Sequence, residues 1–580
     1  MWLEMDMTLE LEMSLQLLME RLEEAGTLEN TVFVLDRNSN IGYNSLDSAS
    51  DIVQGVSRVF PAFFLLVAAL VCITTMTRMI DEERTQIGTL KALGYSNREI
   101  INKYLIYAGS GAIVGCGLGV FVGSAVFPII LWQAYKIMLY ITDGIVLKFN
   151  WWLCGAVVGA YTIVMLLVTW YCCRRSLEEV PAELIRPKAP TSGKKIFLEH
   201  LGFWEKLSFL NKVMLRNIFR YRQRLLMMLL GIGGCTALLV TGFGLRDSIQ
   251  DIAVAQFDDI MIYDMAVSFS GEQLPEDQEA FVAELGKNLD SAHFFHQSSA
   301  ELDHNDQIRE VYLIASDGAL TGYIDLHRGE EAVPMPGLGE ALISIGAADI
   351  MGISVGDTIT VRDPDMRELT LKVSGIFDNN VYSYVIISPE TIENQWGEAP
   401  EKQVAYLNVR EGMDDHSVSA KVSGMEGVLS VMVCQDMADS VAQMLDALDL
   451  VVVTVVVCAA LLAVIVLYNL ININIKERLR EIATIKVLGF NSGETAAYVF
   501  KENLLLSVMG AVLGLPAGKL LLNFVMSQIK IDMLWIGSMV TPLSYILAFI
   551  MTMLSAVIVD FIFHFVLEKI NMAEALKSVE

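Results

Sequence analysis

Long apolar stretches alternate with polar segments along this chain, and seven of them are long enough to cross a lipid bilayer. The hydrocarbon core of a bilayer is about 30 Å thick and needs roughly 20 apolar residues in a helix. The sixth stretch is the least regular, because it contains Pro516 and Lys519. The expected spans are Val59–Thr77, Tyr104–Tyr135, Phe149–Cys173, Leu225–Leu245, Val451–Ile475, Asn503–Gln528 and Met533–Val559.

Lysine and arginine predict how these spans are oriented. They are concentrated in residues 78–103, 174–224 and 476–486, and loops rich in Lys and Arg stay in the cytoplasm. The C-terminus is then expected inside, and residues 1–57, 136–148 and 246–446 outside. Lys519 falls near the outer interface, where its long side chain can reach water.

A short charged phrase occurs twice, 395 positions apart, each time after an apolar run. The two copies are TQIGTLKALGYSNREI and REIATIKVLGFNSGET. Gly115 and Gly119 match Gly510 and Gly514 at the same offset. The chain therefore contains a first repeat of three spans, residues 58–187, and a second repeat, residues 447–580.

Each phrase predicts a short helix, a sharp turn and a second helix. The apolar residues Ile87, Leu90 and Leu93, and likewise Ile482, Ile485 and Leu488, form one stripe that we expect to be buried. A glycine ends each helix, and a capping box at Ser96–Glu99 or Asn491–Glu494 begins the next one. The segment could be a simple connector. Its repetition with the same length and residues favours a docking element for a two-fold symmetric partner.

Glycines at four-residue spacing indicate close helix packing inside the membrane. Small residues let two helix backbones approach each other in lipid, although glycine is also common in membrane helices generally. The expected packing positions are Gly115, Gly119 and Gly123 in the first repeat, and Gly510 and Gly514 in the second.

The polar segment 246–446 predicts a separate α+β domain outside the membrane. Strands are expected in REVYLIAS, DTITVR and LTLKVSGIF, and a helix in PEDQEAFVAELGKNL. About 37 of the 68 acidic residues and 10 of the 41 basic residues lie here, so this domain carries the whole net charge of −27. Such acidity argues against nucleic acid as a partner. Cys434 is the only cysteine in this segment, so no disulfide is expected within it.

We found no catalytic motif in the sequence. The phosphate-binding pattern G-x-x-x-x-G-K-[ST] is missing, as are H-E-x-x-H and G-x-S-x-G. The stretch HFFHQSSAELDH, with His293, His296, Asp303 and His304, could hold zinc. The polarity of an acidic surface explains that stretch equally well, so no metal site is predicted.

The chain resembles the FtsX-like permeases, the membrane subunits of MacB-type (type VII) ABC transporters. The resemblance covers nearly everything from about Asn30 onward. It rests on EERTQIGTLKALGYS, KERLREIATIKVLGFN, PAELIRPKAP and LRNIFRYRQRLLMMLLGIGGCTALLVTGFGLRDSI. VLDRNSNIGYNSLDSASDI resembles the end of a first outer domain. In such a family unit a leading span and an outer domain would precede Val59, so the chain looks N-terminally truncated.

The resemblance implies that the two phrases are coupling helices, seated on a separate cytoplasmic ABC ATPase dimer that binds ATP and Mg²⁺. No cofactor is then expected in this chain itself, and the other implied partners are membrane lipid and an extracytoplasmic protein. The implied ATPase-coupling residues are Glu82, Glu83, Arg84, Ile87, Leu90, Lys91, Leu93, Gly94 and Tyr95, and Glu477, Arg478, Glu481, Ile482, Ile485, Lys486, Leu488, Gly489 and Phe490.

Together these observations predict a polytopic α-helical protein of the bacterial cell membrane with an α+β extracytoplasmic domain. The expected function is that of a permease without enzymatic activity of its own, which exports or extracts a lipid, peptide or lipoprotein. The alternative is a non-transporting signalling or scaffold protein that controls a cell-wall partner. The expected parts are an outer tail at 1–57, the first repeat at 58–187, a cytoplasmic linker at 188–224, a single span at 225–245, the acidic domain at 246–446 and the second repeat at 447–580.

Overall fold

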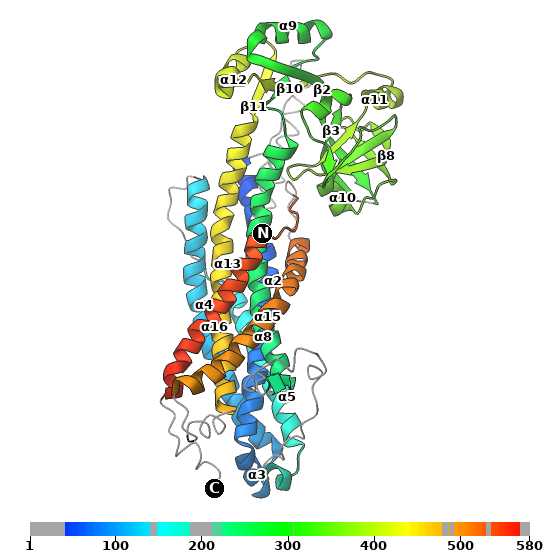
Figure 1. The fold of residues 1–580 in the computed structure, drawn as a ribbon. Helices are drawn as coiled ribbons and strands as arrows, with labels where there is room; N and C mark the ends of the chain where they lie inside the picture. The colour runs from blue at the N-terminus through cyan, green and yellow to red at the C-terminus, as the bar shows by residue number, and fades with distance from the viewer. Residues whose placement is uncertain are drawn as a thin grey trace. The chain divides into compact units, whose positions relative to one another are not determined.

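The computed structural model describes residues 41–139, 148–185, 212, 215–216, 218–219, 222–305, 307–477, 487, 492–528 and 535–568. Seven helices in this part of the chain are long and apolar enough to cross a membrane, as expected. They are α2 (Ile41–Glu82, with the span at Phe60–Glu82), α4 (Asn97–Leu139), α5 (Trp151–Leu177), α8 (Arg222–Val254), α13 (Cys434–Glu477), α15 (Ser492–Gln528) and α16 (Pro542–Glu568) (Figure 1).

The helix boundaries differ from the expectation at three places. The last span begins at Pro542 rather than Met533. Helix α8 continues past Leu245 to Val254, and a π-helix, η4 (Ala255–Ile260), extends it. Helix α13 starts at Cys434, well before residue 447. The boundaries at 245/246 and 446/447 therefore lie within unbroken helices, because the charged residues there interrupt the apolar run but not the helix.

Helix α8 lies at the centre of the main membrane core. It packs against α13, α15 and α16 of the second repeat, and its residues Leu238, Leu239 and Val240 are fully buried. Thr236 and Thr552 form a hydrogen bond of 3.0 Å between α8 and α16. Polar side chains that pair inside the membrane add to the association of helices.

The first repeat has a smaller core of its own at one end of its spans. It combines residues of α2, α4, α5, the short helix α3 (Arg84–Ala92) and α6 (Pro181–Ile185). Its buried members are Met76, Ile80, Ile87, Ile100, Tyr104, Cys172, Cys173, Leu177 and Leu184.

The acidic domain contains a nine-stranded sheet in the order β11-β1-β10-β2-β3-β9-β6-β8-β7. The 16-residue strand β2 belongs to two parts of it, because its first half pairs with β10 and its second half with β3 and β7. The pairing of β2 with β7 closes the last six strands into a ring. The strands are β1 (Met265–Phe269), β2 (Leu289–His304), β3 (Gln307–Ala315), β6 (Glu340–Ser344), β7 (Thr358–Arg362), β8 (Glu368–Phe377), β9 (Tyr384–Ile387), β10 (Val404–Val409) and β11 (Val428–Val433).

The remaining elements of this domain are short. A two-stranded sheet is formed by β4 (His327–Arg328) and β5 (Glu331–Ala332). The helices are α9 (Pro275–Leu285), α10 (Ile345–Met351), α11 (Pro389–Trp396) and α12 (Asp415–Ser423), with the 3-10 turns η5 (Gly286–Asn288) and η6 (Gly318–Gly322). The predicted strands are confirmed, and the helix predicted over 275–289 is confirmed as α9, which ends at Leu285. A turn at Gly356 with φ +101° precedes β7.

Candidate functional site

Residues 82–95, which include most of the first copy of the repeated phrase, contain the short helix α3 between α2 and α4, and we call them the first connector. Gly94 ends α3 at φ +94°, a conformation that glycine adopts without strain. The amide of Gly94 donates to the Lys91 carbonyl at 3.1 Å, and that of Tyr95 to the Leu90 carbonyl at 3.1 Å. These two bonds are the Schellman pattern. They satisfy carbonyls that the end of the helix leaves open.

The predicted capping box at the start of α4 is confirmed. The amide and hydroxyl of Ser96 both donate to Oε2 of Glu99 at 2.8 Å, and the Glu99 amide donates back to the Ser96 hydroxyl at 3.4 Å. The turn between α3 and α4 is therefore fixed by local bonds on both sides.

The inner face of α3 rests on α6. Ile87 and Gly88 are buried there, and a Cβ atom at Gly88 would lie 2.9 Å from Cγ1 of Ile185 and 3.0 Å from Cβ of Leu184. Such contacts are shorter than real Cβ atoms normally make, so only glycine allows α6 to approach this closely. Helix α6 follows α5, so this contact joins the first connector, which lies between α2 and α4, to α5 as well.

Three charged side chains of the connector are held within the chain. Arg84 forms an ion pair with Glu179, and Nζ of Lys91 donates to the carbonyls of Leu177 at 2.7 Å and Glu179 at 3.0 Å. Glu83 accepts bonds of 2.7 Å from Lys103 and from Tyr104. Partial burial acts to raise the pKa of Glu83, but these two bonds outweigh it and hold that pKa below its ordinary value.

The C-terminal end of the first connector exposes two large apolar side chains. The prediction that the apolar stripe is buried is therefore partly wrong. Ile87 is buried and Leu90 is half-buried, whereas Leu93 is 71% exposed and Tyr95 is 53% exposed. Leu93 is the C-cap residue of α3, directly before the turn at Gly94. Glu82 is exposed and pairs with Arg78 one turn earlier.

The second copy of the phrase, which we call the second connector, lies mostly outside the described residues. Glu477 is the last residue of α13. The coupling positions Arg478, Glu481, Ile482, Ile485, Lys486, Leu488, Gly489 and Phe490 are not described, so their role stays a prediction.

The glycine positions behave differently in the two repeats. In the second repeat, a Cβ atom at Gly510 would lie 2.8 Å from Cβ of Ile232, and one at Gly514 would lie 2.6 Å from the Gly233 carbonyl oxygen. Both glycines therefore allow α15 to contact α8, as predicted. Gly518, which the sequence analysis did not single out, also faces α8, where its Cβ would lie 2.5 Å from Cβ of Val240.

The packing prediction is wrong for the first repeat within the described residues. Nothing there lies within 4 Å of a Cβ atom built at Gly115, Gly119 or Gly123. No helix among the described residues packs on this face of α4, and the span shows no buried residue in its most apolar window. The same glycine spacing therefore does not give the same contact, because only α15 has α8 beside it.

Gln256, in the π-helix η4 that follows α8, connects the membrane helices to the acidic domain through hydrogen bonds. This fully buried residue lies in η4, and π-helices often mark functional positions. Its Oε1 accepts bonds from the amides of Asn380 at 2.7 Å and Val381 at 3.2 Å. Its Nε2 donates to Oδ1 of Asn379 at 2.9 Å. One side chain thus holds the loop between β8 and β9, in which Tyr382 adopts a φ of +62°.

The segment before α16, residues 535–541, contacts the same loop. The Trp535 amide donates to the Asn380 carbonyl at 2.9 Å, and its indole donates to Asp349 of α10 at 3.4 Å. Further along, the Thr541 amide and hydroxyl both donate to Asp247 of α8. Lys519 of α15 donates to the Ser538 carbonyl at 2.7 Å, as expected for a lysine near the outer interface.

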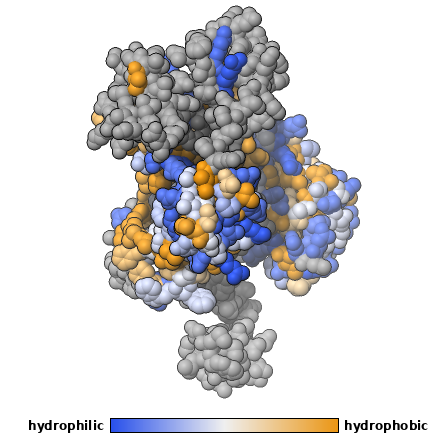
Figure 2. All heavy atoms as spheres, turned by 90° about the horizontal axis from the view of Figure 1, so that it is seen from below, coloured by the Kyte–Doolittle hydropathy of each residue, from blue (hydrophilic) through white to orange (hydrophobic). Residues whose placement is uncertain are grey.

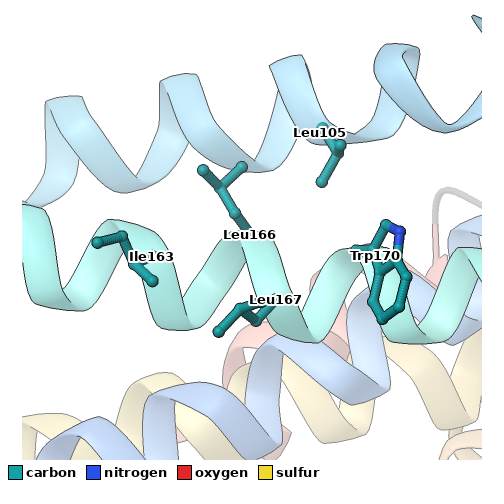
Figure 3. A pocket seen from close by; sticks show the side chains of 5 residues that line it. All are labelled: Leu105, Ile163, Leu166, Leu167 and Trp170. Atoms are coloured by element: carbon teal, nitrogen blue, oxygen red, sulfur yellow. The ribbon is translucent and has the colours of Figure 1, made fainter. Parts of the chain in front are cut away.

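A groove on the surface of the described chain is lined by apolar residues. The groove of about 380 Å³ lies between α4 and α5 and is lined by Leu105, Ile163, Leu166, Leu167 and Trp170 (Figure 3). Figure 2 shows the molecule from below, and on this face hydrophilic and hydrophobic residues are interspersed over the described surface.

The possible zinc ligands do not converge. His293 and His296 are three residues apart on strand β2 and bond to different groups, the Ser316 hydroxyl at 2.7 Å and the Glu401 carbonyl at 2.8 Å. No cluster of three or more His, Cys, Asp or Glu residues that could hold a metal occurs in the described ranges.

Comparison with known proteins identifies the two repeats. The family model described as FtsX-like permease C-terminal matches residues 58–181 and 453–567. Each repeat matches this family model over most of its length. These matches coincide with the two three-helix sets α2, α4, α5 and α13, α15, α16, and the seven apolar helices fit a multi-pass protein of the cell membrane.

One curated relative and two solved structures are similar to parts of this chain. An uncharacterised ABC transporter permease of Methanocaldococcus jannaschii is 25% identical over 177 residues, which are 29% of this chain and 44% of that protein. The chain thus spans less than half the length of that relative. The periplasmic region of MacB from Actinobacillus actinomycetemcomitans is 11% identical, with a TM-score of 0.21, and covers 33% of this chain and 97% of that one. The extracellular domain of the transporter YknZ from Gram-positive bacteria is 11% identical, with a TM-score of 0.20, and covers 29% and 98%.

Gln256, Trp535 and Gly518 are not among the residues predicted from the sequence. Gln256 and Trp535 act through partners more than a hundred residues away, and neither is part of a repeated pattern. Gly518 could have been found, because it stands 395 positions after Gly123.

Proposed function

We propose that this permease is the membrane subunit of an ABC transporter, driven by a separate cytoplasmic ATPase dimer that binds ATP and Mg²⁺. The observation that supports this most is the first connector. It exposes Leu93 and Tyr95 next to each other while its charged residues are held within the chain. Two exposed apolar side chains on a rigid turn suit insertion into a groove of a protein partner.

Motion of the connectors would reach the acidic domain through α8, α13 and the segment 535–541. Helices α8 and α13 run without a break from the membrane core towards that domain. Gln256 and Trp535 then bind the same loop, residues 379–383, through its backbone. Because these bonds hold the backbone of the loop, a shift of α8 relative to α16 would be passed to β8, β9 and α10.

The cargo in this proposal is a lipid, peptide or lipoprotein that is exported or extracted by movement of the acidic domain. Support for this class comes from the family resemblance, and the apolar groove between α4 and α5 is compatible with lipid contact. The proposal assigns hydrolysis of ATP to the partner, since no phosphate-binding motif occurs in this sequence.

The test is the double variant Leu93→Asp with Tyr95→Asp, expressed together with the ATPase. An aspartate at each position would carry a charge into the partner groove, and burying an unpaired charge is strongly unfavourable. We expect the ATPase recovered with the permease to fall about tenfold or more, as is typical when residues that dominate an interface are lost. Leu90 is a poorer choice, because it also packs in the core of the first repeat.

The matched control is Leu429→Asp, which changes an equally exposed leucine in the acidic domain. It is expected to leave ATPase recovery unchanged. Recovery that stays normal in the connector variant, at wild-type expression and membrane insertion, would refute the docking role.

A further inference from the structure

Buried polar side chains gather in the second repeat where α13, α15 and α16 meet. Asn474 is completely buried, Asn503 is 1% exposed and Asp560 is 8% exposed. Nδ2 of Asn474 donates to Oδ1 of Asn503 at 2.7 Å, and Nδ2 of Asn503 donates to Oδ1 of Asp560 at 3.2 Å. The three side chains thus form one chain of hydrogen bonds that ends on a carboxylate.

This cluster contains more acceptors than donors. Both amide NH₂ groups are directed along the chain towards Asp560. Among the described residues, Oδ1 of Asn474 has no hydrogen-bond partner, and neither has the hydroxyl of Ser507, which lies one helical turn after Asn503 on α15. Buried polar atoms are normally paired, so two unpaired oxygens in a cluster that also contains the Asp560 carboxylate suit a positively charged ligand. Glu502 is also fully buried but has an interaction of its own, and we do not count it among the unpaired groups.

The first repeat builds the same helices without this cluster. At the 395-residue offset, Met79, Ala108 and Ala112 stand in place of Asn474, Asn503 and Ser507. Helices α5 and α16 both have 27 residues, and aligning their ends puts Thr169 opposite Asp560. Because the three-helix fold forms with Met79, Ala108, Ala112 and an uncharged threonine at these positions, the fold itself does not require the cluster.

We propose that Asp560, Asn474 and Ser507 form a binding site for a monovalent cation, with Na⁺ as the ion to test. Carboxylate, amide and hydroxyl oxygens are the ligands that hard cations prefer. One carboxylate neutralises one positive charge, which removes the cost of an unpaired charge inside a span. Asn474 lies three residues before the end of α13 at Glu477, so the site adjoins the start of the second connector.

The experiment measures the melting temperature of the full-length permease with its ATPase in detergent, as NaCl replaces choline chloride at constant ionic strength. Binding to the folded state alone stabilises it, so we expect the melting temperature to rise by about 2 °C or more between 1 and 100 mM Na⁺. Asp560→Asn should abolish this rise. The control Asp439→Asn, the same change at an exposed position of α13, should retain it.

A second variant covers the case in which Asp560→Asn does not fold. Ser507→Ala removes one ligand only and should shift the midpoint of the Na⁺ titration about tenfold upward. Radioactive ²²Na⁺ bound to the wild-type protein, with one ion per chain, gives a direct count. The proposal is overturned if choline stabilises equally, if wild-type protein does not respond, or if Asp560→Asn responds like wild-type. Recovery of the ATPase is scored separately, so a failure here leaves the proposed function standing.

Discussion

The contact between α8 and α15 allows a prediction with an internal control. Alanine at Gly514 would place a Cβ atom 2.6 Å from the Gly233 carbonyl oxygen and 2.6 Å from Cβ of Thr236. Ordinary contacts begin at 3.4 Å, so the two helices must separate by roughly 0.8 Å. Alanine at Gly119, the matching position of the first repeat, has nothing within 4 Å.

The expected magnitude follows from two opposing terms. Replacing glycine by alanine inside a helix stabilises it by about 1 kcal/mol in either repeat. Overpacking a close contact costs about 1–3 kcal/mol, and this cost applies only to Gly514→Ala. Comparing the two variants cancels the first term, so Gly514→Ala should be less stable than Gly119→Ala by about 1–3 kcal/mol.

The assay is thermal unfolding of both variants in the same detergent, followed by the fluorescence of a thiol-reactive dye. Gly115→Ala serves as a second control, because its surroundings are also open. Gly514→Ala should melt several degrees below both controls. If it melts at the same temperature or higher, then α8 and α15 do not touch at Gly514, and the difference between the two repeats described above is wrong.

Two further predictions concern the acidic domain. Burial lowers the pKa of His293, although Asp317 acts in the opposite direction. The neutral form of His293 therefore stabilises the folded state above about pH 6.5, and this stabilisation is lost as the pH falls through the lowered pKa. His293→Gln should therefore lose less melting temperature between pH 7.5 and 5.5 than the wild-type protein does. In Gln256→Leu the buried amides of Asn380 and Val381 lose their acceptor, so the free energy of unfolding measured in urea should fall by about 1–3 kcal/mol. Hydrogen exchange at residues 379–383 should also become faster. The control Gln250→Leu, at an exposed position, should change neither measurement.

Much of the architecture could be predicted from the sequence, because the patterns that decide it are local. The seven spans depend on apolar length alone, and all seven overlap the predicted ranges, although the fourth continues to Ile260 and the last begins at Pro542. The turn at Gly94 and the capping box at Ser96 depend on residues within four positions of each other. The separate acidic domain follows from composition and from strands with alternating polarity.

What could not be predicted depends on which helices become neighbours. Gly119 and Gly514 stand at matching positions of the two repeats, yet only Gly514 contacts α8. Leu93 continues the spacing of Ile87 and Leu90, but α6 covers only the first part of that face. The cluster around Asp560 draws on three helices, and no single segment of the sequence shows it.

The close fit of Gly88 under α6 determines how force would spread from the first connector. Helix α3 continues into α4 through a tightly bonded turn, and Arg84 and Lys91 attach it to the residues that follow α5. A load applied at Leu93 is therefore shared by α4 and α5 at once. The first repeat would tilt as a single lever rather than bend one helix at a time.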